Sequence, residues 1–430
     1  MAAKLRVLLV SLGHPDLVMG GSPLACQELF DELRGRDDID CHMLAAVDRE
    51  AGDAHQPNAG ITGFDGRDGL YALHQTGYDS WLHRNSEPKL IEAFVALLHA
   101  LRPDVVHFHH FMAVGVDLIS AARRALPSSR ILFTFHEFAA ICAADGHMVR
   151  RTDHSLCDHS SPMRCHQCLP GRRPDDFMIR KLWMEQHLRQ ADHFTCPSRF
   201  MIEHYVTWGI PRGQISQVAN GQRSRVVRPL LPPSDAAAKG ASRNRFGFFG
   251  LLNDDKGVHV LLRAVSLLRE EGFSNFRIDI NGGGIQNASP AIREEIQTFE
   301  QAERLRPPAE RLVSFNGPYN LDQIQSRMAG VDWTIVPSVW WEIFGLVISE
   351  AWMFGRPVIC SNVGGMAERV THEVDGLHFE MGDPAALAAT IKRACTEDGL
   401  WERLHESLPA PPSRAVMADS YLELYQRPRD

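Results

Sequence analysis

The sequence lacks features that would assign it to several classes of protein. No apolar run in its 430 residues approaches the roughly 18 uninterrupted residues of a membrane-spanning helix. The N-terminus runs into the strand pattern Leu5–Ser11 without the hydrophobic segment of a signal peptide. Lysine and arginine total 45 against 53 aspartate and glutamate residues, and this net charge of -8 argues against a general nucleic-acid-binding protein. We therefore expect a cytoplasmic protein with no nucleic-acid partner.

Cysteine is also scarce. The nine cysteines are an odd number, which fits reduced thiols or a metal site better than a disulfide framework. An apolar content of 44% and a charged content of 23% are ordinary for a globular protein. A chain of this length is long enough for two domains of roughly 200 residues each.

The most informative stretch is Pro337–Phe354, which reads PSVWWEIFGLVISEAWMF. The apolar run Val331–Val336 before it predicts a buried parallel strand, and Leu346–Phe354 predicts a helix. The loop between them would lie at the carboxyl end of a strand, where open α/β sheets bind ligands. The N-terminus of the helix directs free N–H groups toward a phosphate. Glu342 and Glu350 would accept hydrogen bonds from uncharged sugar hydroxyls.

Strand and helix patterns alternate along the rest of the chain, which predicts doubly wound parallel sheets. In the first half, Ser22 would cap the helix Ser22–Arg34 and Pro23 suits its first turn. Residues 222–244 are rich in Pro, Ser, Ala and Arg, which predicts a linker. The expected organisation is an N-terminal α/β domain (1–221) with an insertion (51–87) and a Cys/His-rich loop (139–173), the linker (222–244), a C-terminal α/β domain (245–412) and a final helix crossing back to the first domain (413–430).

Glu342 and Glu350, with Phe344-Gly345-Leu346 between them, resemble the E-x7-E motif of the retaining glycosyltransferases of family 4. That resemblance implies the GT-B fold, in which two Rossmann-like domains with doubly wound parallel sheets face each other across a cleft. It also implies that Glu350 binds the ribose of a nucleoside-diphosphate sugar and that Glu342 lies near the donor sugar. The amides of Phe344, Gly345 and Leu346 would hold the diphosphate.

Two further motifs of the second half support this resemblance. The turn Gly250–Gly257 resembles the family's G-R-x-x-x-x-K-G, so Gly250 would approach the donor and Lys256 would neutralise its diphosphate. Leu251 stands where the family commonly has arginine, so Lys256, helix N–H groups or an arginine from elsewhere must carry more of the charge. Gly364–Glu368 matches the family's G-G-x-x-E.

In the first half the resemblance rests on Gly20-Gly21 and His136. The glycine pair resembles the family's pair facing the diphosphate or acceptor, which assigns Gly21 to the donor; a tight turn explains the pair equally well. His136 follows the strand pattern Arg130–Phe135. The resemblance would place it at the donor sugar, where it contacts a hydroxyl and helps to stabilise positive charge at the anomeric carbon. A purely structural histidine is the alternative.

Cys142, Cys157, Cys165 and Cys168 lie within 27 residues, and Cys165-x2-Cys168 has the spacing of a metal clip. Four thiolates could hold a structural zinc that orders a loop with few apolar residues. Four reduced cysteines are the alternative. We expect no requirement for a catalytic metal.

A helix predicted at Pro174–Arg189 carries Arg180 and Lys181 and follows Arg172 and Arg173. Such a basic face could contact an anionic lipid-linked acceptor or the inner face of a membrane, as a peripheral protein does. A solvated charged face is the alternative.

These observations predict a retaining glycosyltransferase. It would move a hexose-type sugar from a UDP- or GDP-type donor to a hydroxyl of a glycan, a lipid-linked molecule or a small molecule, in polysaccharide, glycolipid or glycoconjugate synthesis. A sugar-nucleotide 2-epimerase and a non-catalytic nucleotide-sugar-binding protein of the same fold stay open. A sugar-nucleotide dehydrogenase is disfavoured because Leu12–Gly21 lacks G-x-G-x-x-G. A metal-dependent GT-A enzyme needs D-x-D after a strand, whereas Asp38-Ile39-Asp40 precedes one.

Overall fold

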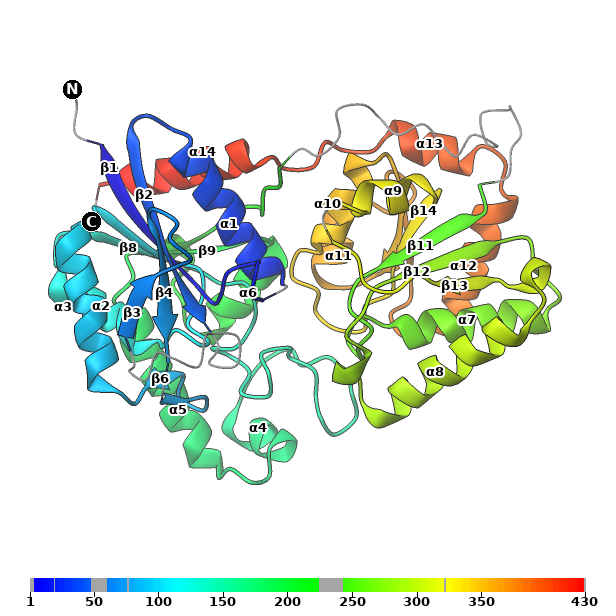
Figure 1. Ribbon diagram of the computed structural model, residues 1–430. Coiled ribbons are helices and arrows are strands. Elements are labelled where there is room, and N and C mark those ends of the chain that lie inside the picture. Colours follow the sequence, from blue (N-terminus) through cyan, green and yellow to red (C-terminus); the bar gives the residue numbers. More distant parts are fainter. Residues whose placement is uncertain are drawn as a thin grey trace. The chain divides into compact units, whose positions relative to one another are not determined.

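A computed structural model describes residues 4–18, 20–47, 60–75, 77–223, 243–320 and 322–428 of the chain. The chain forms two compact units, one of Met1–Arg223 with Pro412–Asp430 and one of Ser224–Pro411. Each unit contains a largely parallel sheet with helices between successive strands (Figure 1), which confirms the predicted fold class. Residues 51–59 of the predicted insertion and 224–242 of the predicted linker lie outside the described residues.

The first unit is built on an eight-stranded sheet of order β10-β9-β8-β7-β1-β2-β4-β3. Neighbouring strands pair in parallel, except that β3 and β4 are antiparallel. The strands are β1 (Leu5–Ser11), β2 (Ile39–Val47), β3 (Gly60–Gly63), β4 (Leu70–His74), β7 (Val105–Phe108), β8 (Arg130–Thr134), β9 (His193–Cys196) and β10 (Ile215–Gln217), with a separate small hairpin of β5 (Tyr78–Asp79) and β6 (Arg84–Asn85).

The helices of the first unit connect these strands. They are α1 (Gly21–Arg34), α2 (Pro88–Leu101), α3 (Asp117–Ala125), α4 (Pro162–Cys168), α5 (Pro174–Leu188), α6 (Arg199–Trp208) and α14 (Arg414–Gln426). Helix α1 begins at Gly21, one residue earlier than predicted, and its N-cap is Gly20 without a side-chain hydrogen bond, so the predicted cap at Ser22 was wrong. In the described part of the chain, no helix is both long and apolar enough to cross a membrane.

The region predicted as an insertion continues the sheet instead. Strand β4 pairs with β2 in parallel, with Leu70–His74 opposite Met43–Val47, and β3 adds the edge strand. Leu70, Ala72 and Leu73 are buried in this strand. Their short pattern stands among polar and glycine-rich residues, which is why the sequence did not reveal a strand here.

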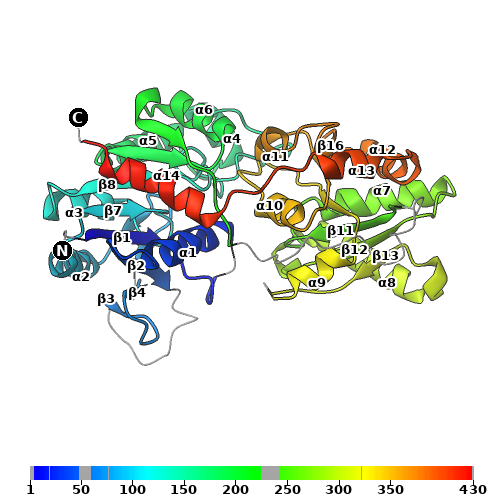
Figure 2. The same cartoon turned by 90° about the horizontal axis from the view of Figure 1, so that it is seen from above.

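The last helix of the chain belongs to the core of the first unit. Helix α14 packs beside α1 (Figures 1 and 2), where Arg414 donates to Glu32 over 3.0 Å. Its Tyr421 hydroxyl is 3.0 Å from Thr134 Oγ1, and its Tyr425 hydroxyl is 2.8 Å from His107 Nδ1. These buried hydrogen bonds fix α14 to strands β7 and β8.

The second unit has a six-stranded, fully parallel sheet of order β13-β12-β11-β14-β15-β16. Counted from β11 this order is 3-2-1-4-5-6, and the direction of winding reverses between β11 and β14. The elements are β11 (Arg245–Phe249), α7 (Val258–Glu270), β12 (Arg277–Asn281), α8 (Pro290–Leu305), β13 (Val313–Phe315), α9 (Ile324–Ala329), β14 (Trp333–Val336), α10 (Leu346–Met353), β15 (Val358–Ser361), α11 (Gly364–Arg369), β16 (Gly376–Phe379), α12 (Pro384–Thr396) and α13 (Leu400–Glu406).

Both faces of this second sheet are buried, as its uniformly apolar strands require. In β14, Trp333 and Ile335 pack into the cluster that includes α7, α12 and α13, whereas Val336 packs against α10 and α11. Ile359 of β15 likewise joins the first cluster, and its neighbour Cys360 joins the second. Helices therefore cover both faces, and the carboxyl ends of the strands are the edge left for loops that bind ligands.

Candidate active site

Two loops meet at the point where the winding of the second sheet reverses. One follows β11 and the other follows β14, and Val339 N of the second donates to Asp255 O of the first over 2.8 Å. Gly257 makes their close approach possible, since a Cβ atom at that position would lie 1.8 Å from Pro337 O, and its φ is +68°. A side chain at position 257 would clash with this carbonyl, and residues other than glycine rarely adopt this dihedral. Open α/β sheets bind ligands at this kind of reversal.

The predicted lysine and the first predicted glutamate come together here. Lys256 Nζ donates to Glu342 Oε2 over 2.5 Å. Trp340 Nε1 and Ser338 Oγ donate to the same oxygen over 3.2 and 3.4 Å. The side chain of Lys256 is 28% exposed and that of Glu342 is 10% exposed, so the lysine is the partner that an incoming ligand can reach. Glu342 is therefore the largely buried carboxylate of the pair, and Lys256 is its more exposed cation.

The second predicted glutamate lies one helical turn into α10. This helix begins at Leu346, after Gly345, which has a left-handed φ of 65°. Because the first N–H groups of a helix have no partner within it, they point out of the helix end. Glu350 is buried, and its carboxylate lies close enough to Tyr319 to act on that residue: burial, followed by the charge of Glu350, raises the pKa of the Tyr319 phenol. Lys256, Glu342 and Glu350 therefore all belong to the second unit, and Glu350 lies on the helix that follows the loop of Glu342.

The glycine at the end of β11 has a close backbone neighbour. Gly250 N donates to Asn281 O over 3.0 Å, and a Cβ atom at Gly282 would lie 1.8 Å from Gly250 O. The carboxyl ends of β11 and β12 are thus held in contact through glycines. Leu251, which stands where the family has arginine, is 43% exposed.

Helix α11 also contacts the loop after β14, and sequence reasoning found no role for these contacts. Gly365 N donates to Glu342 O over 2.7 Å. The guanidinium of Arg369 donates to Phe344 O over 2.9 Å and to Gly345 O over 3.0 Å. The glycine lies in the matched G-G-x-x-E pattern, but the arginine follows that pattern and carries no sequence signal of its own.

His136 lies in the first unit, just after β8. Its Nε2 is 3.1 Å from Nδ1 of His109, which follows the neighbouring strand β7. Burial, and then the charge of His110, lower the pKa of His136 to about 3, so its ring is neutral at neutral pH. The adjacent His110 pairs through Nε2 with Glu137 Oε2 over 2.8 Å. The structure thus places His136 in a histidine cluster that the sequence did not predict.

Gly21 is the first residue of α1, after β1. A Cβ atom at Gly20 would come no closer than 3.4 Å, to Pro23 Cδ, so packing alone does not require glycine there. Strands β1, β7 and β8 are consecutive in the first sheet, and its winding reverses between β1 and β7. Gly21 and His136 consequently lie at the same edge of one sheet.

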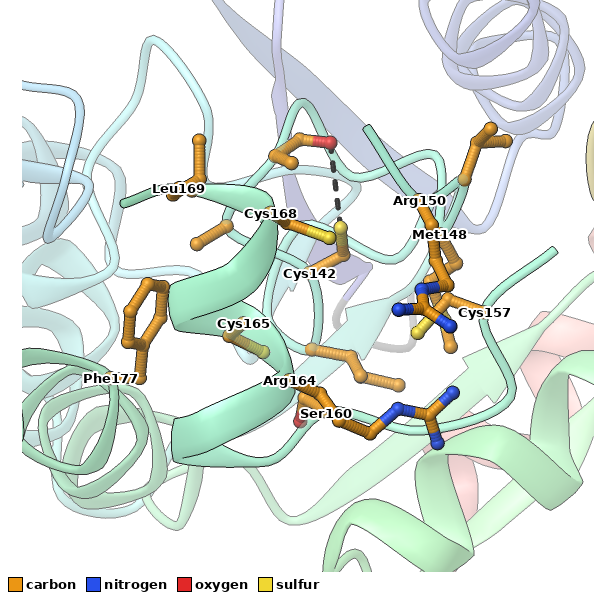
Figure 3. Close-up of a pocket in the computed structure, with 14 residues that line it drawn as sticks. Cys142, Met148, Arg150, Cys157, Ser160, Arg164, Cys165, Cys168, Leu169 and Phe177 are labelled. Atoms are coloured by element: carbon orange, nitrogen blue, oxygen red, sulfur yellow. Dashed lines mark hydrogen bonds between the residues drawn. The ribbon is translucent and has the colours of Figure 1, made fainter. Parts of the chain in front are cut away.

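The four cysteines of the Cys/His-rich loop line a single small pocket (Figure 3). Two of their thiols donate to nearby carbonyls: Cys142 Sγ to Ala144 O over 3.4 Å, marked in Figure 3, and Cys157 Sγ to His159 O over 3.2 Å. No three His, Cys, Asp or Glu side chains of the described residues form a group that could hold a metal ion. The four-thiolate zinc site stays a prediction, and the thiols of Cys142 and Cys157 would have to leave these carbonyls to serve it.

Two family models match consecutive parts of the chain. The model described as "Glycosyltransferase Family 4" matches residues 19–222, and the model described as "Glycosyl transferases group 1" matches residues 243–397. Together they span most of the chain and divide it between its two units. The second match contains Lys256, Glu342 and Glu350.

Individual proteins resemble the chain along most of its length. A D-inositol 3-phosphate glycosyltransferase of Xylanimonas cellulosilytica is 26% identical over 84% of this chain and 84% of its own. The solved structure of HepE of Anabaena in complex with UDP and glucose superposes with a TM-score of 0.64 at 18% identity, covering 98% of this chain and 99% of that one. Sucrose-phosphate synthase of Thermosynechococcus elongatus gives a TM-score of 0.68 at 20% identity over 98% of both chains. At these identities the two solved structures establish the fold alone.

Proposed function

Because this chain belongs to the glycosyltransferases of family 4, we propose that it is a retaining enzyme that transfers a hexose-type sugar from a nucleoside diphosphate to an acceptor hydroxyl. The observation that carries this proposal is the pairing of Lys256 with Glu342 where the winding of the second sheet reverses, in the loop that leads into the helix carrying Glu350. A cation beside helix amides suits a diphosphate, and buried carboxylates suit sugar hydroxyls.

Lys256 and the loop amides bind the diphosphate in this proposal. An ammonium group has three donors, so Lys256 can keep Glu342 as one partner and bind a phosphate oxygen with another. The amides of Phe344, Gly345 and Leu346 surround the start of α10, where the helix dipole adds partial positive charge. Gly250, at the end of β11, brings backbone close to the donor. These groups would stabilise the negative charge that develops on the leaving diphosphate.

The acidic residues hold the uncharged parts of the donor. Glu350 accepts hydrogen bonds from the ribose hydroxyls, and Glu342 accepts them from the transferred sugar. In the first unit, we assign His136 to a hydroxyl of the donor sugar and Gly21 to the donor's neighbourhood. The low pKa of His136, about 3, supports its role, because a neutral ring does not repel positive charge developing at the anomeric carbon.

Retention follows from attack on the face that the leaving group vacates. The bond between the anomeric carbon and the diphosphate oxygen breaks first, and its electron pair stays on the diphosphate. The acceptor hydroxyl then bonds to the same face of the carbon, and its proton passes to the departing diphosphate oxygen. No strong protein base and no catalytic metal are needed for this sequence.

The donor and acceptor are chosen by analogy. UDP is the first nucleotide to test, because HepE was solved with UDP and glucose, and GDP is the second. D-inositol 3-phosphate is the first acceptor, because the relative from Xylanimonas is named for it. Glycan and lipid-linked acceptors follow, since polysaccharide, glycolipid or glycoconjugate synthesis is the proposed setting.

The decisive experiment measures release of free nucleoside diphosphate from a panel of nucleotide-sugars, with and without acceptors, together with the anomeric configuration of the product by NMR. Acceptor-dependent release with a retained configuration is the expected result. Conversion of the donor without any acceptor would instead support the 2-epimerase. Thermal stabilisation by a nucleotide-sugar without release or conversion would support a binding protein.

Three further proposals concern the surroundings of the enzyme. We propose that it acts in the cytoplasm, and that Arg172, Arg173 and Lys181 provide peripheral contact with a membrane carrying a lipid-linked acceptor. Arg180, predicted on the same basic face, is buried and donates to Ala139 O and Ala140 O, so that part of the prediction was wrong. Vesicle sedimentation tests the membrane contact.

A structural zinc at the four cysteines would require Cys142 and Cys157 to leave their carbonyl partners. Fewer than about half a zinc per chain, in protein purified without chelator, would reject the zinc.

A further inference from the structure

Arg369 ends α11 directly against the loop that opens α10. Besides its bonds to Phe344 O and Gly345 O, its Nη2 donates to Ser349 Oγ over 2.7 Å. Its guanidinium carbon lies 3.8 Å from the ring centroid of Phe344 and 4.9 Å from that of Trp352. One side chain therefore contacts the loop, the first turns of α10 and two aromatic faces.

The polar partners of this guanidinium are all uncharged. Among the described residues it forms no ion pair with a carboxylate, and only carbonyl, hydroxyl and aromatic groups meet it. Burial lowers the pKa of Arg369 to about 9, with Glu368 and Asp375 opposing the shift, so it remains positively charged at neutral pH. Withdrawing a charge from water without a counterion costs free energy. If residue 369 served only for packing, an apolar side chain would therefore be more stable at this position than an arginine.

The two carbonyls that Arg369 contacts belong to particular peptide groups. The carbonyl of Phe344 shares its peptide group with the N–H of Gly345, and the carbonyl of Gly345 shares its group with the N–H of Leu346. In a trans peptide the N–H and C=O point in opposite directions, so both N–H groups face away from Arg369. A charged donor on the carbonyl also polarises the group and strengthens the hydrogen bond that its N–H can donate.

We propose that Arg369 is a positioning residue for the donor diphosphate, because it fixes and polarises the peptide groups whose N–H donors, those of Gly345 and Leu346, bind the diphosphate. This inference rests on the proposed function of the loop. It also favours, among the three alternatives for replacing the charge missing at Leu251, an arginine from elsewhere in the chain. Arg369 supplies its charge through the backbone rather than by touching the ligand.

A second contact from the same helix fixes the other end of the loop. Gly365 N donates to Glu342 O over 2.7 Å, and a Cβ atom at Gly365 would lie 2.2 Å from Ile343 O. Helix α11 thus holds the loop at residues 342, 344 and 345. The loop's geometry is determined before any ligand arrives, as binding by preorganised dipoles requires.

The test compares three variants. Arg369→Met keeps a long side chain without charge or donors, and Arg369→Lys keeps the charge without the two-pronged geometry. The control is Arg356→Lys, because Arg356 is a fully buried arginine of the second unit and likewise donates to a carbonyl, Met328 O, over 3.1 Å, away from the loop. Each variant is examined by amide hydrogen exchange over residues 340–350, UDP and GDP affinity, and the donor's KM and kcat.

We expect Arg369→Met to speed exchange at residues 344–347 and to weaken diphosphate binding about tenfold, a polarised hydrogen bond being worth roughly 1.4 kcal/mol. Arg369→Lys should restore part of the affinity. Arg356→Lys should lower the melting temperature while leaving loop exchange and affinity unchanged.

Two results would overturn the inference: unchanged loop exchange in Arg369→Met, or equal loss of affinity in Arg356→Lys and Arg369→Lys. If the wild-type protein binds neither nucleotide and turns over no donor, the proposed function fails instead. In that case the exchange data still decide whether Arg369 fixes the loop.

Discussion

The Nζ atom of Lys256 lies 2.5 Å from the Oε2 atom of Glu342. The two residues come from loops after different strands, so the fold of the second unit alone brings them together. The pairing means that the lysine is already held in place by a carboxylate before a donor arrives. In the proposed function a diphosphate would therefore meet a fixed cation, with Glu342 held by hydrogen bonds beside the proposed position of the sugar.

Replacing Lys256 tests the charge that the leaving diphosphate needs. We expect Lys256→Ala to lower kcat by about 10²–10³-fold, the usual loss when one group that stabilises a leaving oxyanion is removed. The measurement is steady-state release of nucleoside diphosphate. Lys392→Ala is the control, since Lys392 pairs with Glu271 over 2.9 Å on the exposed surface of the same unit and should change kcat less than about twofold. Equal rates for wild type and Lys256→Ala would contradict the assignment.

Replacing Glu350 tests the contact with the ribose. Glu350→Gln keeps the shape but removes the charge, so the donor's KM should rise about tenfold or more, as expected for a hydrogen bond to a charged group. The control is Glu402→Gln, because Glu402 pairs with Arg243 over 3.0 Å and is exposed. If neither the donor's KM nor the affinity for the free nucleoside diphosphate changes in Glu350→Gln, Glu350 does not bind the ribose.

Gly365→Ala tests the close approach of α11 to the loop. The added Cβ would meet Ile343 O at 2.2 Å, so we expect a loss of about 1–3 kcal/mol in the free energy of unfolding and a comparable loss of activity. Gly330→Ala is the matched control, because Gly330 has an ordinary φ of -80° and its Cβ would come no nearer than 3.4 Å to Arg327 O. Calorimetry of both variants measures the difference, and two equal melting temperatures would refute the close contact.

The buried histidines of the first unit predict acid sensitivity. Burial lowers the pKa of His107 and of His136 to about 3 and places that of His109 well below its usual value. The unfolded chain binds protons below about pH 6.5 while the folded chain does not. The contribution of these histidines to the free energy of unfolding should therefore be fully present above about pH 6.5. It should fall as the pH drops toward 3, by about 1.4 kcal/mol per pH unit for each histidine.

Calorimetry between pH 7 and 5 measures this slope. The melting temperature of the first unit should fall with the pH, and His107→Gln should fall less steeply because it removes one of the groups that bind protons on unfolding. A melting temperature that stays constant over this range would contradict the buried neutral histidines.

The sequence predicted the second unit well because its strands are buried on both faces, and each therefore appears as an apolar run that ends where a binding loop begins. The same logic placed Lys256 and Glu342 in loops after strands and Glu350 on the helix that follows the second of these loops. It could not predict β4, whose buried Leu70, Ala72 and Leu73 stand in a polar segment.

Contacts between distant segments were also beyond the sequence. Arg369 bonds to carbonyls 24 and 25 residues earlier, and carbonyls carry no signature in the residue type. The approach of His109 to His136 depends on β7 and β8 being neighbours in the sheet. At the four cysteines the spacing suggested a metal clip, but the sequence could not show that two of the thiols bond to backbone carbonyls.

The most direct test of the central claim is calorimetric titration of the protein with UDP and GDP, repeated with Lys256→Ala and Glu350→Gln. One of the two nucleotides should bind the wild-type protein, and both substitutions should weaken that binding at least about tenfold without lowering the melting temperature. Equal affinity in the wild-type protein and both variants, or binding of neither nucleotide, would contradict it.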